Sequence, residues 1–132
     1  MADDEATGGR AKRLALAEQA LALTDRCSDA YLELTLSKDM TEAEALETLE
    51  AAVAAGKWAV ETPVTDGWSN QHVRPYMRAL REVGERCHLV GLHDRCIEVM
   101  SELLALDASD PLQARLTLVE TSVQAHLLPI RD

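Results

Sequence analysis

The segment from Arg74 to Ser122 constrains the fold most strongly, because it reads as two helices joined by a tight turn at Gly91. On each side of this turn, apolar and small residues recur every three or four positions, which places them on one face of a helix. The first face comprises Leu80, Val83, Gly84 and Cys87, and the second comprises Cys96, Met100, Leu103 and Leu104. The pattern predicts an antiparallel helical hairpin.

Composition extends this prediction to the rest of the chain. Its 132 residues suffice for one domain with a hydrophobic core. Hydrophobic residues make up 47% of the sequence, yet there is no Phe and there are only two Trp and two Tyr. Because strands favour β-branched and aromatic residues, this composition indicates closely packed helices. The predicted fold class is therefore all-α.

Charge and hydropathy argue against two classes of partner, nucleic acids and membranes. The formal net charge is −10, whereas nucleic-acid binding requires clustered Lys and Arg. No apolar run is long enough to span a bilayer, and the acidic start is unlike a signal peptide. We therefore expect no nucleic-acid partner, no membrane association and a cytoplasmic location. Residues 1–66 carry 14 acidic and 6 basic residues, and residues 67–132 carry 9 and 7, so any anion-binding surface should lie in the second half.

Periodicity and breakers divide the chain into a disordered tail at residues 1–9 and a helical domain at 10–128. Six helices are predicted, over residues 10–23, 28–37, 42–55, 75–90, 93–107 and 111–128, and a continuation of the third past Gly56 toward Val60 is left open. Turn-forming residues predict an irregular insertion at about 61–72. The helix-start signals are Ser28 or Asp29, the Thr41–Glu44 capping box, Pro75, His93 or Asp94, and Asp110 followed by Pro111.

Residues 78–111 resemble a tetratricopeptide repeat (TPR). The pattern of that repeat is matched at Leu80, Val83, Gly84, Cys87, Cys96, Met100 and Ala108. Short strings at 51–56, 74–79 and 103–107, with Asp110 and Arg115, are similar to the suppressor-of-tumorigenicity-type TPR proteins. The resemblance implies a right-handed superhelical stack of about six helices whose concave groove binds a peptide or partner helix. It implies no catalytic chemistry and no cofactor.

In such a stack, the first helix of each pair lines the concave groove. On the 75–90 helix, the groove-facing side carries Arg78, Arg81, Glu85 and His88, and Arg74 precedes the helix on the same side. Arg115 of the last helix lies across the groove. Guanidinium groups bind carboxylates through paired hydrogen bonds. The functional hypothesis is therefore a clamp for an acidic segment or a C-terminal carboxylate. The alternative is a solvated face stabilised by ion pairs within the helix.

Four residues around Gly91 have side chains that bind metals: Cys87, His88, His93 and Cys96. Zinc takes Cys and His ligands in a tetrahedral site. Cys87 and Cys96 also occupy packing positions of the repeat, and free cysteine behaves as a small hydrophobic residue. Packing is the favoured interpretation, and a small metal- or redox-responsive regulator is the alternative.

Aromatic residues near the insertion suggest a different interface. Trp58 precedes it, Trp68 lies within it and Tyr76 follows it. Aromatic side chains are favoured at interface centres, although they also fold loops onto helices. Met77, Met100 and the Leu127–Leu128 pair are interpreted as apolar surface at the ends of the stack, which a solenoid must cover. Self-association into a homodimer through such an end is an alternative that the sequence leaves open.

No catalytic motif occurs: the chain contains neither a Gly-rich phosphate loop, nor a Gly-x-Ser-x-Gly elbow, nor His-Glu-x-x-His. The predicted function is a non-enzymatic protein-interaction module, a scaffold or adaptor. A helical domain that binds a small ligand beneath the insertion is a further alternative.

Overall fold

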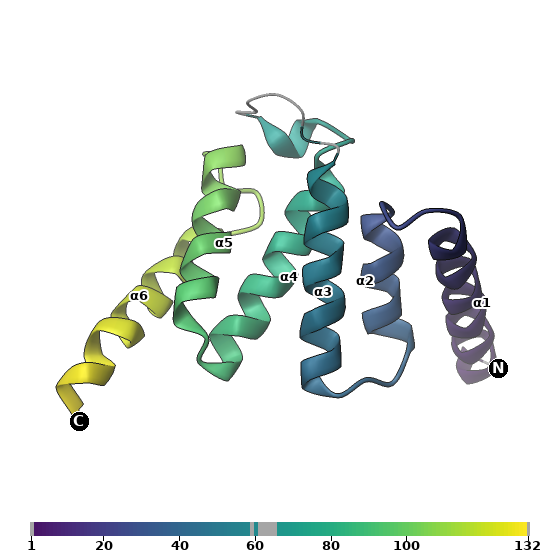
Figure 1. The fold of residues 1–132 in the computed structure, drawn as a ribbon, viewed down its shortest axis with the longest axis horizontal. Helices are drawn as coiled ribbons and strands as arrows, with labels where there is room; N and C mark the ends of the chain where they lie inside the picture. Colours follow the sequence, from purple (N-terminus) through teal and green to yellow (C-terminus); the bar gives the residue numbers. More distant parts are fainter. Residues whose placement is uncertain (1, 59, 61–65, 132) are drawn as a thin grey trace.

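The computed structural model describes residues 2–58, 60 and 66–131. Within this part of the chain the fold is all-α, with six α-helices, one 3-10 turn and no strand. Figure 1 shows the helices following one another in chain order across the molecule, with the two termini at opposite ends. The elements are α1 (Ala2–Leu23), α2 (Ser28–Ser37), α3 (Glu42–Lys57), η1 (Gly67–Ser69), α4 (Arg74–Val90), α5 (His93–Leu106) and α6 (Ala114–Arg131).

Each helix packs on its neighbours along the chain, and the even-numbered helices also contact one another. The backbone of α2 approaches α4, and that of α4 approaches α6. In the described part of the chain, the backbones of α1, α3 and α5 do not approach one another as closely as those of the even-numbered helices do. Helices α3 and α5 are instead linked by the long side chains of Arg95 and Glu50, whose Nη2 and Oε1 atoms lie 2.6 Å apart. The even-numbered helices therefore form the more tightly spaced side of the fold.

The core lies where α3, α4 and α5 meet. Its fully buried side chains include Leu49, Leu80, Val83 and Val99. Gly84 allows α5 close to α4, because a Cβ atom there would lie 2.5 Å from Met100 Cε. Met77 and Met100 are both buried in this core. The expectation that these two methionines form apolar surface at the ends of the stack is therefore wrong.

A second close approach joins α3 to α4. A Cβ atom at Gly56 would lie 2.8 Å from the Cα atom of Tyr76, which is a backbone atom and cannot rotate away. The glycine thus sets the distance between the two helices. Helix α3 continues through Gly56 to Lys57, within the continuation beyond residue 55 that the sequence left open.

Several helix boundaries follow from local signals in the sequence. Thr41 and Glu44 form the predicted reciprocal capping box at the start of α3. Pro75 occupies the first turn of α4, where no intrahelical N–H is needed. Gly91 ends α4 with a φ of 82°, a left-handed conformation that favours glycine. These three predictions are confirmed.

The predicted caps of α2 and α5 are wrong. The residue before α2 is Cys27, and Ser28 lies inside the helix, where its hydroxyl donates to the carbonyl of Ala52 at 2.8 Å. Ser28 therefore connects α2 to α3 instead of capping the free N–H groups at the start of α2. The residue before α5 is Leu92, so His93 begins the helix and caps nothing.

The start of α6 also differs from the prediction. Asp110 and Gln113 adopt positive φ values of 58° and 56°, so Pro111 lies in a turn and the helix begins at Ala114. The carboxylate of Asp110 accepts from the backbone N–H groups of Ala114 and Arg115 at 2.6 and 3.0 Å. Asp110 thus supplies the predicted cap from a different backbone geometry. At its other end, α6 extends beyond the predicted boundary before Pro129.

At the N-terminus, α1 begins at Ala2 and includes residues that the sequence assigned to a disordered tail. Extending an existing helix adds one hydrogen bond for each residue that is ordered, so a helix over 10–23 can lengthen backwards at little cost. Two glycines at positions 8 and 9 do not end it.

The predicted insertion at 61–72 is described from residue 66 onward, and its first five residues lie outside the described part. Asp66 forms a single β-bridge with Asp107 at the end of α5. An Asp107 carboxylate oxygen accepts from the N–H of Trp68 at 3.1 Å, and the other accepts from Ser109. Hydrogen bonds donated by Ser109, and to a smaller extent by Trp68, lower the pKa of the Asp107 carboxyl group. The insertion is thereby fastened to the α5–α6 junction.

Among the described residues, no helix combines the length and the apolar character needed to cross a membrane.

Candidate functional site

A groove between α2 and α4 is the strongest candidate site. It contains a cavity of about 210 Å³. Leu36 of α2 is 74% exposed at its edge, although α2 packs on three other helices. The lining residues are Leu32, Thr35 and Leu36 from α2, and Arg78, Arg81 and Glu82 from α4. The groove therefore combines apolar surface with two guanidinium groups.

The helix spacing of α4 explains why the arginines reach this groove. Leu80, Val83 and Cys87 are buried toward the core. Arg78 and Arg81 lie two positions before and one position after Leu80, so they fall on another face of the helix. Arg81 donates to the Glu85 carboxylate at 3.1 Å, and the two side chains are each partly exposed. Arg78 is exposed and makes no hydrogen bond or ion pair with another residue of the described chain. Arg78 is thus available to a partner.

Arg74 is committed to a structural contact. Its Nε donates to the backbone carbonyl of Trp68, and its guanidinium carbon lies 5.3 Å from the centre of the Trp68 ring. This side chain fixes η1 on the start of α4. The structure does not bring it into the groove with Arg78 and Arg81.

His88 likewise faces a neighbouring helix. Its Nδ1 lies 2.7 Å from the Thr121 hydroxyl of α6, and its Nε2 lies 3.7 Å from the Glu120 carboxylate. The same Thr121 hydroxyl, which is fully buried, lies 3.3 Å from the sulfur of Cys96. His88 therefore joins α4 to α6 instead of extending the arginine groove.

Arg115 lies on the exposed side of α6, next to a different cavity of about 440 Å³ that also includes Leu116 and Val119. Of the six residues predicted for the clamp, the structure thus brings together Arg78, Arg81 and the ion-paired Glu85. Arg74, His88 and Arg115 lie elsewhere.

The cysteines near Gly91 are packing residues in the structure. Cys87 and Cys96 are both completely buried, and burial raises the pKa of each thiol. A raised pKa keeps a thiol protonated and poorly reactive. In the part of the chain that is described, no three His, Cys, Asp or Glu side chains are grouped so that they could hold a metal ion.

The three aromatic residues proposed as an interface do not form one exposed patch. Tyr76 is buried in the core, and Trp68 is half-buried beneath Arg74. Trp58 is 61% exposed, and the Arg26 guanidinium carbon lies 3.8 Å from its ring centre. A cavity of about 440 Å³ lies beside this pair and includes Cys27, His72 and Pro75. This cavity is a candidate location for a small ligand near the insertion.

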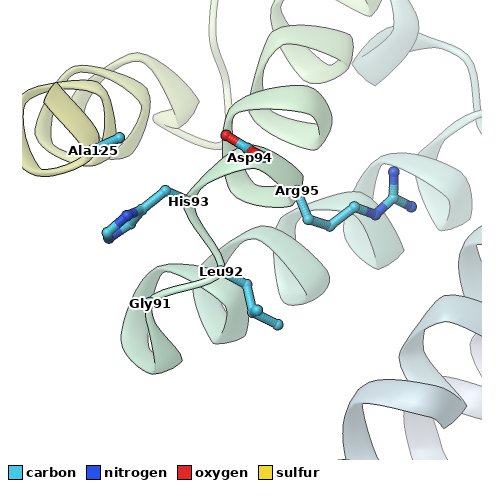
Figure 2. A pocket seen from close by; sticks show the side chains of 6 residues that line it. All are labelled: Gly91, Leu92, His93, Asp94, Arg95 and Ala125. Carbon is cyan, nitrogen blue, oxygen red and sulfur yellow. The ribbon is translucent and has the colours of Figure 1, made fainter. Parts of the chain in front are cut away.

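Another cavity, of about 480 Å³, lies at the α4–α5 turn and carries no convergent chemistry. Figure 2 shows His93 directed toward α6 and Arg95 directed to the opposite side. The Arg95 guanidinium is already bound to Glu50 through two hydrogen bonds of 2.6 and 2.9 Å. This cavity is therefore a surface hollow between a turn and a helix.

Comparison of the chain with protein families, curated proteins and solved structures gives no match. The function must therefore be inferred from the chemistry of its surfaces.

The clamp predicted from the sequence did not include the α2 wall of the groove, where Leu34 is partly buried and Leu36 is exposed. Two positions in a helix differ in direction by about 200°, so the two leucines cannot share a face. Ala30 and Ser37, which are buried, define the inward face. That spacing was a signal that could have marked Leu36 as exposed.

Proposed function

We propose that the chain is a TPR-like interaction module without catalytic activity, located in the cytoplasm, and that it binds an extended peptide in the α2–α4 groove. The packing of consecutive helices and the contacts among α2, α4 and α6 support this class of architecture. All three cysteines are free thiols, which fits a reducing compartment. No cofactor is required.

The single observation that carries the proposal is the pairing of an unengaged Arg78 with the exposed Leu36 across one groove. A guanidinium recognises a carboxylate through two parallel hydrogen bonds, and the leucine offers apolar contact beside it. The matching partner is a peptide with an acidic side chain or a free C-terminal carboxylate next to an apolar residue. Within the groove lining, the carboxylate of Glu82 lies with the two guanidinium groups of Arg78 and Arg81, so the lining residues carry a net positive charge.

An array of random peptides, each made with a free C-terminal carboxylate and again as an amide, tests this proposal. We expect the protein to retain acidic or carboxylate-bearing peptides with an apolar neighbour. Loss of a charge-assisted hydrogen bond costs about 1.5–3 kcal/mol, so Arg78→Ala should weaken the best binders about 10- to 100-fold.

The matched control is Arg86→Ala on the same helix. Arg86 pairs with Glu42 of α3 at 2.8 Å and does not line the groove. The Arg86→Ala variant should bind the same peptides as tightly as the wild type does. Equal retention of peptides by the wild type, Arg78→Ala and Leu36→Asp would refute the proposal.

A further inference from the structure

Helix α6 has one buried face and one apolar face that is exposed. Ala114 and Thr121 are buried, and Leu118 packs against the core. The opposite face carries Leu116, Val119 and Val123, whose exposed fractions are 63, 55 and 51%. Their spacing of three and then four residues aligns them along a single stripe.

This stripe has the spacing of a coiled-coil seam. With Leu116 and Val123 at a positions and Val119 at the d position, the buried Ala114 and Thr121 fall at the f positions, which point away from the seam. A partner helix on the stripe would therefore meet no part of the core. His126 occupies the next d position, so the apolar seam is limited to Leu116–Val123.

The charged residues beside the seam indicate what covers it. Arg115 lies at the g position on one flank, and Glu120 lies at the e position on the other. In a parallel pair of helices, each g residue lies opposite the e residue five positions later on the partner. Two copies of α6 would thus form the Arg115–Glu120 contact twice.

The antiparallel arrangement lacks this complementarity. A two-fold axis perpendicular to the helices brings identical flanks together, so the Arg115 flanks would face each other and the Glu120 flanks would do the same. The Glu120 side chain, 3.7 Å from His88, is still 52% exposed and can be reached by a partner.

We propose that α6 pairs with α6 of a second copy of this chain as a short parallel coiled coil, with Leu116, Val119 and Val123 at its seam. This interface is separate from the α2–α4 groove and does not depend on the proposed peptide binding. Three apolar residues make a short seam, so the dimer is weak and reversible.

Sedimentation equilibrium over a concentration series tests the interface. The apparent mass of the wild type should rise from 14.5 kDa toward twice that value. Val119→Glu should stay at the monomer mass with an unchanged helical circular dichroism spectrum, since Val119 is on the exposed face. Leu23→Glu, at an exposed leucine of α1, is the control and should dimerise like the wild type. A wild type that stays monomeric, or a Val119→Glu variant that dimerises normally, would overturn the proposal.

Charge reversal tests the parallel orientation. Arg115→Glu and Glu120→Arg should each weaken dimerisation at least several-fold, because each places like charges opposite one another. The double variant restores opposite charges and should recover the wild-type dissociation constant. A double variant that is as weak as the single variants would overturn the parallel arrangement.

Cross-linking provides a readout that does not depend on affinity. In a Cys27→Ser background, Leu116→Cys and Val123→Cys should each form a disulfide-linked dimer on mild oxidation, because a parallel seam brings identical residues together at every a position. Failure of either position to cross-link would contradict the proposed register.

Discussion

Helices α1 and α4 are held in the molecule by different chemistry. Among the α1 residues whose side chains are described, Ala17 is the only one that is fully buried, and Leu23 is 88% exposed. Leu14, Ala20 and Leu21 are only partly buried, and two polar contacts tie α1 to α2: Arg10 donates to the carbonyl of Ser37 at 3.0 Å, and Arg13 donates to Glu33 at 2.8 Å. Helix α4 instead buries an apolar face against both α3 and α5.

The difference indicates that the stable unit is built around α3, α4 and α5, with α1 as an outer cover. Burial of apolar side chains is the dominant favourable contribution to folding, whereas exposed ion pairs contribute little. Identical types of substitution should therefore have different effects in the two regions.

The largest difference is expected for leucine truncation. Leu80→Ala removes a buried side chain of α4 and should lower the free energy of unfolding by about 2–5 kcal/mol. Leu23→Ala, at the exposed end of α1, should change it by less than about 0.5 kcal/mol. Urea unfolding monitored by circular dichroism measures both. Equal losses would show that α1 belongs to the same core as α4.

Gly→Ala substitutions should change the free energy of unfolding by smaller amounts, and the change should have opposite signs in the two regions. Gly56→Ala forces the α3 backbone away from Tyr76 and should destabilise the protein by about 1–3 kcal/mol. Gly9→Ala in α1 meets only the flexible end of the Arg13 side chain and should stabilise the helix by up to about 1 kcal/mol. Thermal unfolding of the two variants gives the signs. A stabilising Gly56→Ala would disprove the close contact between α3 and α4.

The smallest effect is expected for the ion pair between α1 and α2. Arg13→Ala should cost less than about 1 kcal/mol, because both partners are partly exposed to water. High salt should reduce this cost further through screening. Hydrogen exchange of the α1 amides in the wild type and the variant, at low and high salt, measures the effect locally. A large, salt-independent loss of protection would indicate that the pair is part of a buried network.

Local sequence signals predicted much of the fold. The Thr41–Glu44 capping box, Pro75 and Gly91 each act within a few residues of their own position, so a single sequence reveals them. Ser28 shows where this reasoning fails. Its hydroxyl reaches across to the carbonyl of Ala52, and a side chain engaged by another helix no longer follows the preferences of its own.

The candidate site was predictable only in part, for the same reason. Periodicity placed Arg74, Arg78, Arg81 and His88 on related positions of α4, but it could not show that η1 would engage Arg74 or that α6 would engage His88. The apolar wall supplied by α2 comes from a segment far away in the sequence. Which arginine remains available is decided by tertiary contacts.

The packing of each helix on its chain neighbours has a consequence for folding and for mechanical behaviour. Contacts between segments close in the sequence lose little chain entropy when they form, so this topology belongs to the rapidly folding class. The termini lie at opposite ends of the row of helices (Figure 1), so a force applied between them would pass through successive helix interfaces in series. Such a chain unravels one helix at a time from its outer ends, with α1 detaching before the α3–α5 core opens.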